Sequence, residues 1–386
     1  MTVVIAGVAE SEHGESSWVD VLDLEERLVL DACSDAGVAS DELDAILTVP
    51  PRAGRYLVDA AAVAERLGAH PRYAFTLEAG GTAPITMVDL ARRLIESGSA
   101  RQVAVVAADL ALTGVGRGAY VGNLAAGHGP VHPEIEAPYH PTVVSLFALV
   151  ASRYLFEHGL HADALGEVAV QASGSAQTHP LAHLRESFTI ADYRESRMIS
   201  SPLRLLDCAP VSDGGGAVIV TGAEDPQDER PRVLGIGSAT SQLHLSAANA
   251  PVAEAYRRAS AIAELESGVA VVDVDLALVY DCFTIAAVLA VESLGLARPG
   301  TAPARFSAGD FGAGGTMPVN PHGGLLRHGH PARAGGMSNL VEAVLQLRGL
   351  AEGRQVPDCR RAVVHGMTGV FAQQAVMLLG WNGGVR

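Results

Sequence analysis

Asn320-Pro-His-Gly-Gly-Leu-Leu-Arg-His-Gly-His-Pro-Ala-Arg-Ala-Gly-Gly336 is the stretch that decides how this chain is interpreted. It places His330 on a glycine-rich turn, directly before a segment of amphipathic helical period. Glycines let a backbone approach a ligand closely, and the first turn of a helix offers unpaired N–H groups at the positive end of its dipole. The stretch therefore predicts a site that stabilises negative charge on an oxygen atom, with an imidazole beside it.

Strand-like and helix-like segments alternate on the N-terminal side of this stretch. Short runs rich in β-branched residues predict strands at 3–7, 43–49, 74–77 and 103–108. Apolar residues at intervals of three and four predict amphipathic helices between them, at 20–36, 60–67 and 86–95. This alternation indicates an α/β fold with largely buried strands.

The same order recurs after an acidic, proline-containing joint at 223–231. Strands are predicted again at 232–238, 277–281 and 362–365, and the glycine-rich stretch takes the place of 78–83 in the first half. We therefore expect two duplicated halves, residues 1–222 and 232–386. From about 112 to 200 the pattern loosens into glycine, proline and histidine, which predicts an insertion that covers a site and contains one helix at 144–159.

Five blocks, in this order and spacing, resemble those of the thiolase superfamily, in particular the sterol-carrier-protein thiolases and the thiolase-like acyl-CoA aldolases. The blocks are 78–84, 201–217, 280–284, 320–336 and 364–369. The resemblance implies two βαβαβαββ halves in a five-layer α-β-α-β-α sandwich, with a loop domain inserted in the first half. It also implies a homodimer that forms by antiparallel pairing of the strand around 74–77.

This chain departs from the family pattern at the residues that carry the chemistry. The resemblance places the nucleophilic cysteine of the family at Gly81, where no thiol exists. The second family cysteine aligns with His365, and the Asn or His of the third block aligns with Tyr280. The histidine of the Gly-His-Pro block is retained, as His330. Without a thiolate no acyl-enzyme of the usual kind forms, so we expect chemistry through an enolate instead.

The expected catalytic residues are Tyr280, His330 and His365. In this hypothesis Tyr280 or His330 takes the proton of a β-hydroxyl, the Cα–Cβ bond breaks, and the other group protonates the enolate. A tyrosine with an ordinary pKa of about 10 is a poor base, so we expect His365 beside the phenol to activate it. The simpler interpretation of Tyr280 and His365 is packing alone. The expected oxyanion and substrate-binding residues are Gly80, Gly81, Gly329, Asn320 and His322.

The resemblance implies retro-aldol cleavage of a β-hydroxyacyl thioester, with coenzyme A as part of the substrate and no permanently bound cofactor. The missing cysteine and the tyrosine of the third block match the aldolases, which work with a partner carrying an OB-fold domain, so an OB-fold or zinc-ribbon partner is expected. One alternative is an acyltransferase or condensing enzyme that acts with a partner protein. The other is a non-catalytic scaffold subunit that binds acyl-CoA or lipid.

Composition argues against several other classes of protein. The net charge of -16, without a basic stripe, argues against nucleic-acid binding. The four cysteines stand far apart, which predicts neither a disulfide framework nor a zinc site and favours the cytoplasm. We find no export signal and no apolar run that predicts a membrane span.

Three further features have competing interpretations. Cys282 stands near Tyr280 in the sequence and is a candidate substitute nucleophile, although no base is evident beside it. The glycines after Asp213 predict a tight turn rather than a phosphate cradle, because no helix start follows them. Histidines in the insertion invite a metal interpretation, but the prolines among them exclude a helix that would align two imidazoles, so no metal site is expected; they are His128, His132 and His140.

Overall fold

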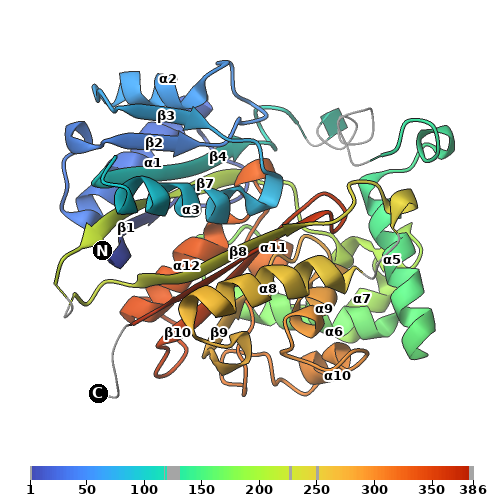
Figure 1. The fold of residues 1–386 in the computed structure, drawn as a ribbon. Coiled ribbons are helices and arrows are strands. Elements are labelled where there is room, and N and C mark those ends of the chain that lie inside the picture. Colours follow the sequence, from blue (N-terminus) through green and yellow to red (C-terminus); the bar gives the residue numbers. More distant parts are fainter. Residues whose placement is uncertain (1, 117, 120–130, 226–227, 249–251, 382–386) are drawn as a thin grey trace.

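The computed structural model describes residues 2–116, 118–119, 131–225, 228–248 and 252–381. Within these residues, nine strands form one mixed sheet in the order β3-β2-β4-β7-β1-β8-β11-β10-β9. The first five strands of that order come from the N-terminal half and the last four from the C-terminal half, and the two sets lie one above the other in Figure 1. The predicted α/β fold is confirmed.

The N-terminal half has the predicted order of elements. Its strands are β1 (Thr2–Glu10), β2 (Ala45–Thr48), β3 (Tyr73–Thr76), β4 (Gln102–Leu110) and β7 (Asp213–Ala223). Its helices are α1 (Val21–Ala36), α2 (Asp59–Arg66) and α3 (Ala83–Glu96). Strand β2 pairs in parallel with β3 and β4, as helical crossovers require, and β7 runs antiparallel between β4 and β1.

The C-terminal half repeats this order. Its strands are β8 (Arg232–Thr240), β9 (Leu276–Leu278), β10 (Arg361–Thr368) and β11 (Gln373–Gly380). Its helices are α8 (Ala253–Ser267), α9 (Thr284–Ser293), α10 (Ala302–Ser307), α11 (Gly324–Arg327) and α12 (Met337–Arg348). The third strand of the repeat is reduced to one parallel bridge between Ala277 and Val319. The predicted joint at 223–231 falls where β7 ends and before β8 begins, and the division into halves at 1–222 and 232–386 stays a prediction.

The glycines after Asp213 do not form the predicted tight turn. They begin strand β7, and its pairing with β4 and β1 extends them. The Asp213 carboxylate accepts the Leu112 N–H at 2.7 Å and the Thr113 hydroxyl at 2.6 Å, so it fixes the chain where it leaves β4. The prediction failed because a run of glycines in a buried central strand is not distinguishable by composition from a turn.

The insertion contains α5 (Val143–His158), α6 (Asp163–Ala176), α7 (Ile190–Glu195) and the short strands β5 (Met198–Ser200) and β6 (Leu203–Arg204). Helix α5 is the predicted helix, and Gly159 ends it in the left-handed conformation at φ 62°. After α6, the His183 N–H donates to the His328 carbonyl at 2.8 Å, so the insertion packs on the glycine-rich stretch. No single described helix is long and apolar enough to cross a membrane; α5 and α6 pass that test only as a pair bent by 116°.

Three apolar clusters build the predicted five layers. Alternate residues of β4 face opposite sides: Val105 packs with α3 and α12, and Val106 packs with α1 and α2. Helices α3 and α12 share one cluster with strands of both halves and therefore form the middle layer. Helices α8 and α9, with α5 and α6 of the insertion, pack against the other face of the C-terminal strands, as Figure 1 shows.

In both halves the first strand lies very close to the helix that follows it. A Cβ placed on Gly7 of β1 would lie 2.1 Å from the Ala32 carbonyl oxygen of α1. The equivalent Cβ on Gly237 of β8 would lie 2.0 Å from the Ala259 carbonyl oxygen of α8. Neither backbone leaves space for a side chain, so both halves use glycine for the same contact. The repeated contact supports an internal duplication.

This contact predicts that Gly7→Ala and Gly237→Ala each lower the free energy of unfolding by about 1–3 kcal/mol, because the added methyl must displace a helix. Gly174→Ala in α6 is the matched control. Nothing lies within 4 Å of a Cβ placed there, so alanine should raise stability by about 0.5–1 kcal/mol. Urea denaturation of the three variants measures these differences, and equal effects at all three positions would contradict the packing argument.

Candidate functional site

Three of the sequence blocks, 78–84, 280–284 and 320–336, meet where the two middle-layer helices begin. The 3-10 turn Gly80–Thr82 leads into α3, and the 3-10 turn Ala332–Ala334 comes shortly before α12. A Cβ placed on Gly336 would lie 2.8 Å from the Gly81 carbonyl oxygen, so the two turns are in contact. Tyr280 follows β9 and reaches the same place. Two helix N-termini, each with a positive dipole end, therefore border one site.

Tyr280 and His330 form a hydrogen-bonded pair at this site. The phenol oxygen lies 2.9 Å from Nε2 of His330, and the two rings meet edge to face with centroids 5.8 Å apart. Burial lowers the pKa of His330 to about 4, so its imidazole is neutral near pH 7. A neutral imidazole with its proton on Nδ1 accepts this bond from the phenol. Tyr280 is buried, whereas His330 keeps partial exposure, which gives the pair one open side.

Ser212 holds the backbone of His330 in place. The Ser212 hydroxyl accepts the His330 N–H at 3.2 Å, and the Ser212 N–H donates to the His330 carbonyl at 3.3 Å. The preceding residue, Gly329, has φ 139°, a conformation that side chains disfavour. Gly329 thus shapes the turn before His330, and no contact to a substrate group is assigned to it. Ser212 was not predicted as a site residue, because nothing in the neighbouring sequence distinguishes it from other serines.

The Tyr280 ring explains why position 81 is glycine. A Cβ placed on Gly81 would lie 2.3 Å from Cε2 of Tyr280 and 2.3 Å from the Met367 carbonyl oxygen. The ring thus fills the space that a cysteine side chain would need. The Gly80 N–H already donates to the Glu78 carboxylate at 3.3 Å. Among the described residues, the Gly81 N–H makes no hydrogen bond outside its own turn. Of the two N–H groups expected to stabilise an oxyanion, those of Gly80 and Gly81, the Gly81 N–H is therefore the better placed.

His365 was expected beside the phenol of Tyr280, and the contacts it makes are to the Tyr280 backbone, Gln374 and Tyr256. Its Nδ1 accepts the backbone N–H of Tyr280 at 3.3 Å, which places the proton on Nε2, 2.9 Å from Oε1 of Gln374. Its ring stacks on Tyr256, with centroids 4.9 Å apart. His365 therefore supports the backbone of Tyr280, and His330 is the imidazole that contacts the phenol.

Asn320 and His322 are not brought to the Tyr280–His330 pair by any contact among the described residues. The Asn320 amide bonds to both backbone groups of Val279, at 2.8 and 2.9 Å, and so ties the glycine-rich stretch to the end of β9. His322 is fully buried, with its ring centroid 5.3 Å from that of His328. Both residues make internal contacts, and their expected contact with substrate stays a prediction.

The four free cysteines are poor replacements for the missing thiolate. Burial raises the pKa of Cys33 to about 11 and that of Cys208 and Cys359 to about 12. Burial also raises the pKa of Cys282 well above its usual value. Because the thiolate is the nucleophile, a thiol held neutral in this way is inert, and the candidate role of Cys282 loses its support.

The histidines of the insertion that the structure describes make local contacts. Nδ1 of His132 accepts the N–H groups of Glu134 and Ile135, each at 3.2 Å. His140 follows a 3-10 turn and adopts φ 48°. His128 lies outside the described residues. The metal interpretation of these three histidines gains no support from these contacts.

Comparison with known proteins adds independent findings. Residues 237–381 match a family model described as Thiolase C-terminal domain-like. The chain is 32% identical to an acetyl-CoA acetyltransferase of Methanothermobacter thermautotrophicus, over 97% of this chain and 98% of that protein. It is 30% identical to a steroid side-chain-cleaving aldolase of Thermomonospora curvata, over 95% of each chain. A solved structure named Ltp2-ChsH2(DUF35) aldolase superposes with a TM-score of 0.85 at 25% identity, covering 100% of this chain and 99% of that one.

The contact between position 81 and the phenyl ring predicts a coupled loss of stability. Gly81→Ala should lower the free energy of unfolding by about 1–3 kcal/mol, because the methyl group overlaps the Tyr280 ring and the Met367 carbonyl. In a Tyr280→Ala background the same change should cost less, although the Met367 carbonyl keeps part of the penalty. A double-mutant cycle by urea denaturation measures the coupling. An equal cost in both backgrounds would show that the ring does not exclude a side chain.

The buried His365 predicts lower stability in acid. Burial lowers its pKa to about 4, against an ordinary value of about 6.5, so between these values the unfolded chain binds a proton that the folded chain does not. Stability should therefore fall as the pH falls, with His365 contributing a loss of about 2 kcal/mol between pH 7 and pH 5. Urea denaturation of the wild type and His365→Gln at both pH values measures this share, and an identical pH dependence of the two proteins would contradict it.

Proposed function

Because the chain belongs to the thiolase superfamily of enzymes, we propose that it cleaves the Cα–Cβ bond of a β-hydroxyacyl thioester by a retro-aldol reaction, without a cysteine nucleophile. The observation that carries this proposal is the hydrogen bond between the Tyr280 phenol and Nε2 of His330, at 2.9 Å. The Tyr280 ring fills the place where a thiol would stand at position 81, so an acid–base pair takes over the site of the nucleophile. Thiolase-family enzymes act on coenzyme A substrates without a permanent cofactor.

In the proposed reaction the pair moves one proton and returns it. The β-hydroxyl of the substrate gives its proton to the Tyr280 oxygen as the phenol passes its own proton to Nε2 of His330. The electron pair of the O–H bond forms the new carbonyl, and the pair of the Cα–Cβ bond becomes an enolate. The imidazolium then protonates Cα. The products are a ketone or aldehyde and a shortened acyl thioester, with no net gain or loss of protons.

The depressed pKa of His330 suits this sequence of steps. An imidazole with a pKa of about 4 is neutral before the reaction, so it can receive the phenol proton. Once protonated it is a strong acid, which favours rapid transfer of the proton to the enolate carbon. His365 takes no direct part in this proposal. It acts as a positioning residue that holds the Tyr280 backbone through its 3.3 Å hydrogen bond.

The negative charge of the enolate would lie where the helices α3 and α12 begin. The Gly81 N–H and the positive ends of both helices are the groups proposed to stabilise it. Charge of this kind develops only as the Cα–Cβ bond breaks, so these groups would lower the barrier without binding the substrate more tightly. The expected contact of Asn320 and His322 with the substrate remains a prediction.

Acyl transfer is the second candidate function. Its support is the 32% identity to an acetyl-CoA acetyltransferase over nearly the whole chain. Such a reaction would need an activated acyl group supplied by another protein, because each cysteine of this chain has a raised pKa. The aldolase relative and the aldolase structure, together with the Tyr280–His330 pair, favour C–C bond cleavage.

The expected partners are part of this proposal. Strand β3 lies at the edge of the sheet and exposes Phe75, which suits antiparallel pairing with a second copy of the chain. The similar solved structure is named Ltp2-ChsH2(DUF35) aldolase, which supports a partner protein, and a partner of the OB-fold or zinc-ribbon kind stays a prediction. The acyl-CoA substrate and the cytoplasmic location stay predictions.

Exchange of the α-hydrogens of butanoyl-CoA in D₂O tests enolate formation without knowledge of the full substrate. The wild type, with a purified partner where one copurifies, should incorporate deuterium at Cα. His330→Gln should slow the exchange by about 10²–10⁴-fold, because it removes the group that transfers a proton to and from Cα. Tyr280→Phe should slow the exchange less, because butanoyl-CoA has no β-hydroxyl from which the phenol could take a proton. His70→Gln, at an exposed position, is the control and should exchange at the wild-type rate.

Three results would distinguish the candidate functions. Exchange at the wild-type rate in His330→Gln would remove His330 from the mechanism. Incorporation of labelled coenzyme A into the thioester would indicate acyl transfer rather than retro-aldol chemistry. Tight binding of butanoyl-CoA with no exchange in the wild type would indicate a scaffold that binds acyl-CoA without reacting.

A further inference from the structure

A buried group of four histidines and one glutamate lies behind the Tyr280–His330 pair. We call it the histidine cluster, and its members are Glu10, His13, His179, His322 and His328. The relative exposures are 4% for His13, 2% for His179 and 0% for His322 and His328, and the Glu10 side chain is 4% exposed. Ring centroids of His13 and His179 lie 4.3 and 4.4 Å from that of His328. Four imidazoles so close together in the interior require a compensating interaction.

Several nitrogens of this cluster lack a hydrogen-bond partner. Among the described residues, Nε2 of His179, Nδ1 of His328 and both ring nitrogens of His322 are buried without one. Most buried polar side-chain atoms in folded proteins are hydrogen bonded, so this concentration of unpaired nitrogens in one place is unusual. The protein alone therefore leaves the polar groups of this cluster poorly satisfied.

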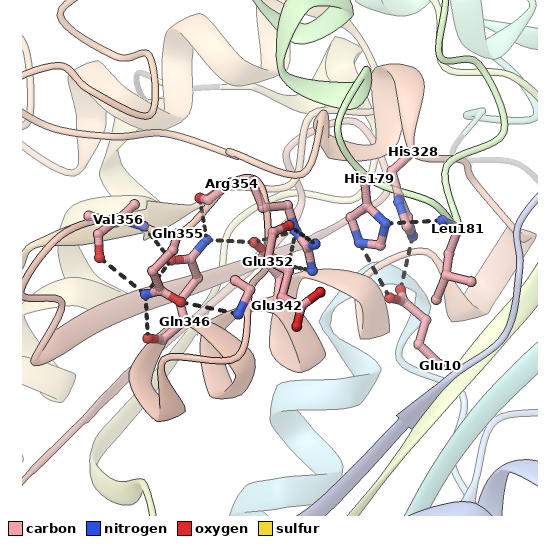
Figure 2. A network of polar contacts seen from close by, with 11 residues as sticks. Glu10, His179, Leu181, His328, Glu342, Gln346, Glu352, Arg354, Gln355 and Val356 are labelled. Atoms are coloured by element: carbon pink, nitrogen blue, oxygen red, sulfur yellow. Dashed lines mark hydrogen bonds and ion pairs between the residues drawn. The ribbon is translucent and has the colours of Figure 1, made fainter.

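Glu10 stands at the centre of the cluster. Its two carboxylate oxygens face two different imidazoles, with Oε1 2.9 Å from Nε2 of His328 and Oε2 3.9 Å from Nε2 of His179. Figure 2 shows both rings directed at the Glu10 carboxylate, beside the ion pair of Arg354 and Glu342. One ligand atom each from Glu10, His13 and His328 all lie within 4.8 Å of one another.

Hydrogen bonds to the backbone settle where two of the protons lie. Nδ1 of His13 lies 3.2 Å from the Ser11 carbonyl, which can only accept, so the proton is on Nδ1 and Nε2 carries the lone pair. Nδ1 of His179 accepts the Leu181 N–H at 3.2 Å, so the proton of this ring is on Nε2 and points at Glu10. His13 is therefore prepared to bind a cation, and His179 is prepared to donate to the carboxylate. Donors of this second kind orient the ligands of many protein metal sites.

We propose that Glu10, His13 and His328 bind one divalent transition-metal ion, of which Zn²⁺ is the probe of choice. Two imidazoles and one carboxylate are ligands that Zn²⁺ prefers, and three protein ligands with an open fourth position are common for it. His328 would bind through Nε2, and its ring proton, which Nε2 donates to Oε1 of Glu10 at 2.9 Å before binding, would move to Nδ1. Ligand atoms around a tetrahedral zinc ion lie about 3.4 Å apart. The three ligand atoms here lie within 4.8 Å of one another, so binding requires them to approach by up to about 1.4 Å.

The ion would connect distant parts of the chain. Glu10 ends β1, His13 follows it, and His328 lies two residues before His330 of the site. A Cβ placed on Gly329 would lie 2.9 Å from Cβ of His13, so the same turn already packs against this segment. The metal would therefore fix the turn that carries His330 without contacting the substrate. This role is structural and holds whether or not the proposed retro-aldol reaction is correct.

Metal analysis of the full-length protein tests this proposal. After removal of metals with a chelator, titration with Zn²⁺ alone should load one ion per chain and raise the Tm by several degrees. Glu10→Gln and His13→Gln should lose the bound ion and the rise in Tm. His70→Gln should keep both. His244→Gln is a second control, because the His132 and His244 rings lie 4.9 Å apart and form another pair of histidines that a metal ion could reach.

Each outcome of these titrations either supports the metal site or overturns it. Loss of the ion in Glu10→Gln and His13→Gln, with retention in both controls, supports the site. No binding by the wild type, or binding that survives Glu10→Gln and is lost in His244→Gln, overturns it. If the cluster variants do not fold, the visible spectrum of the wild type with Co²⁺ tests the site instead. A four- or five-coordinate visible spectrum without a thiolate band supports the site, and absence of bound Co²⁺ overturns it.

Discussion

The fit between the Tyr280 ring and the bare backbone of Gly81 is the constraint on which the site depends. A side chain at position 81 would overlap both the ring and the Met367 carbonyl, so the tyrosine and a cysteine cannot share this place. The absence of the thiol and the presence of the phenol are therefore two aspects of one packing arrangement. The other supports of the site follow from it: His330 bonds to the phenol, and His365 bonds to the Tyr280 backbone.

Much of the fold was predictable because its signals are local. Alternating strand and helix periods located α1, α2, α3 and the strands between them, and the recurrence of that order indicated the duplication. The weak third strand of the second half was not predictable, because a single bridge at Val319 leaves no run of β-branched residues. The glycines of β7 were misread for a related reason: their extended conformation is imposed by neighbouring strands and not by their own preference.

The site was predictable only in part, because its geometry depends on contacts between distant segments. Tyr280, His330 and Gly81 were identified from blocks of sequence, and the structure brings them together. The roles of His365 and Asn320 depend on which neighbour each side chain faces, and no spacing in the sequence encodes that. The histidine cluster is the extreme case. Glu10 and His328 are 318 positions apart, so no local sequence motif predicts their contact.

The N-termini of α3 and α12 lie side by side at the site, and this adjacency affects how such a site can change during evolution. The two helices occupy equivalent positions in the order of elements of the two halves, and both begin beside the Tyr280–His330 pair. Each half contributes one helix dipole, so the electrostatic field at this place is a property of the architecture itself. Reactive side chains there can therefore be exchanged during evolution while the capacity to hold an anion is inherited unchanged.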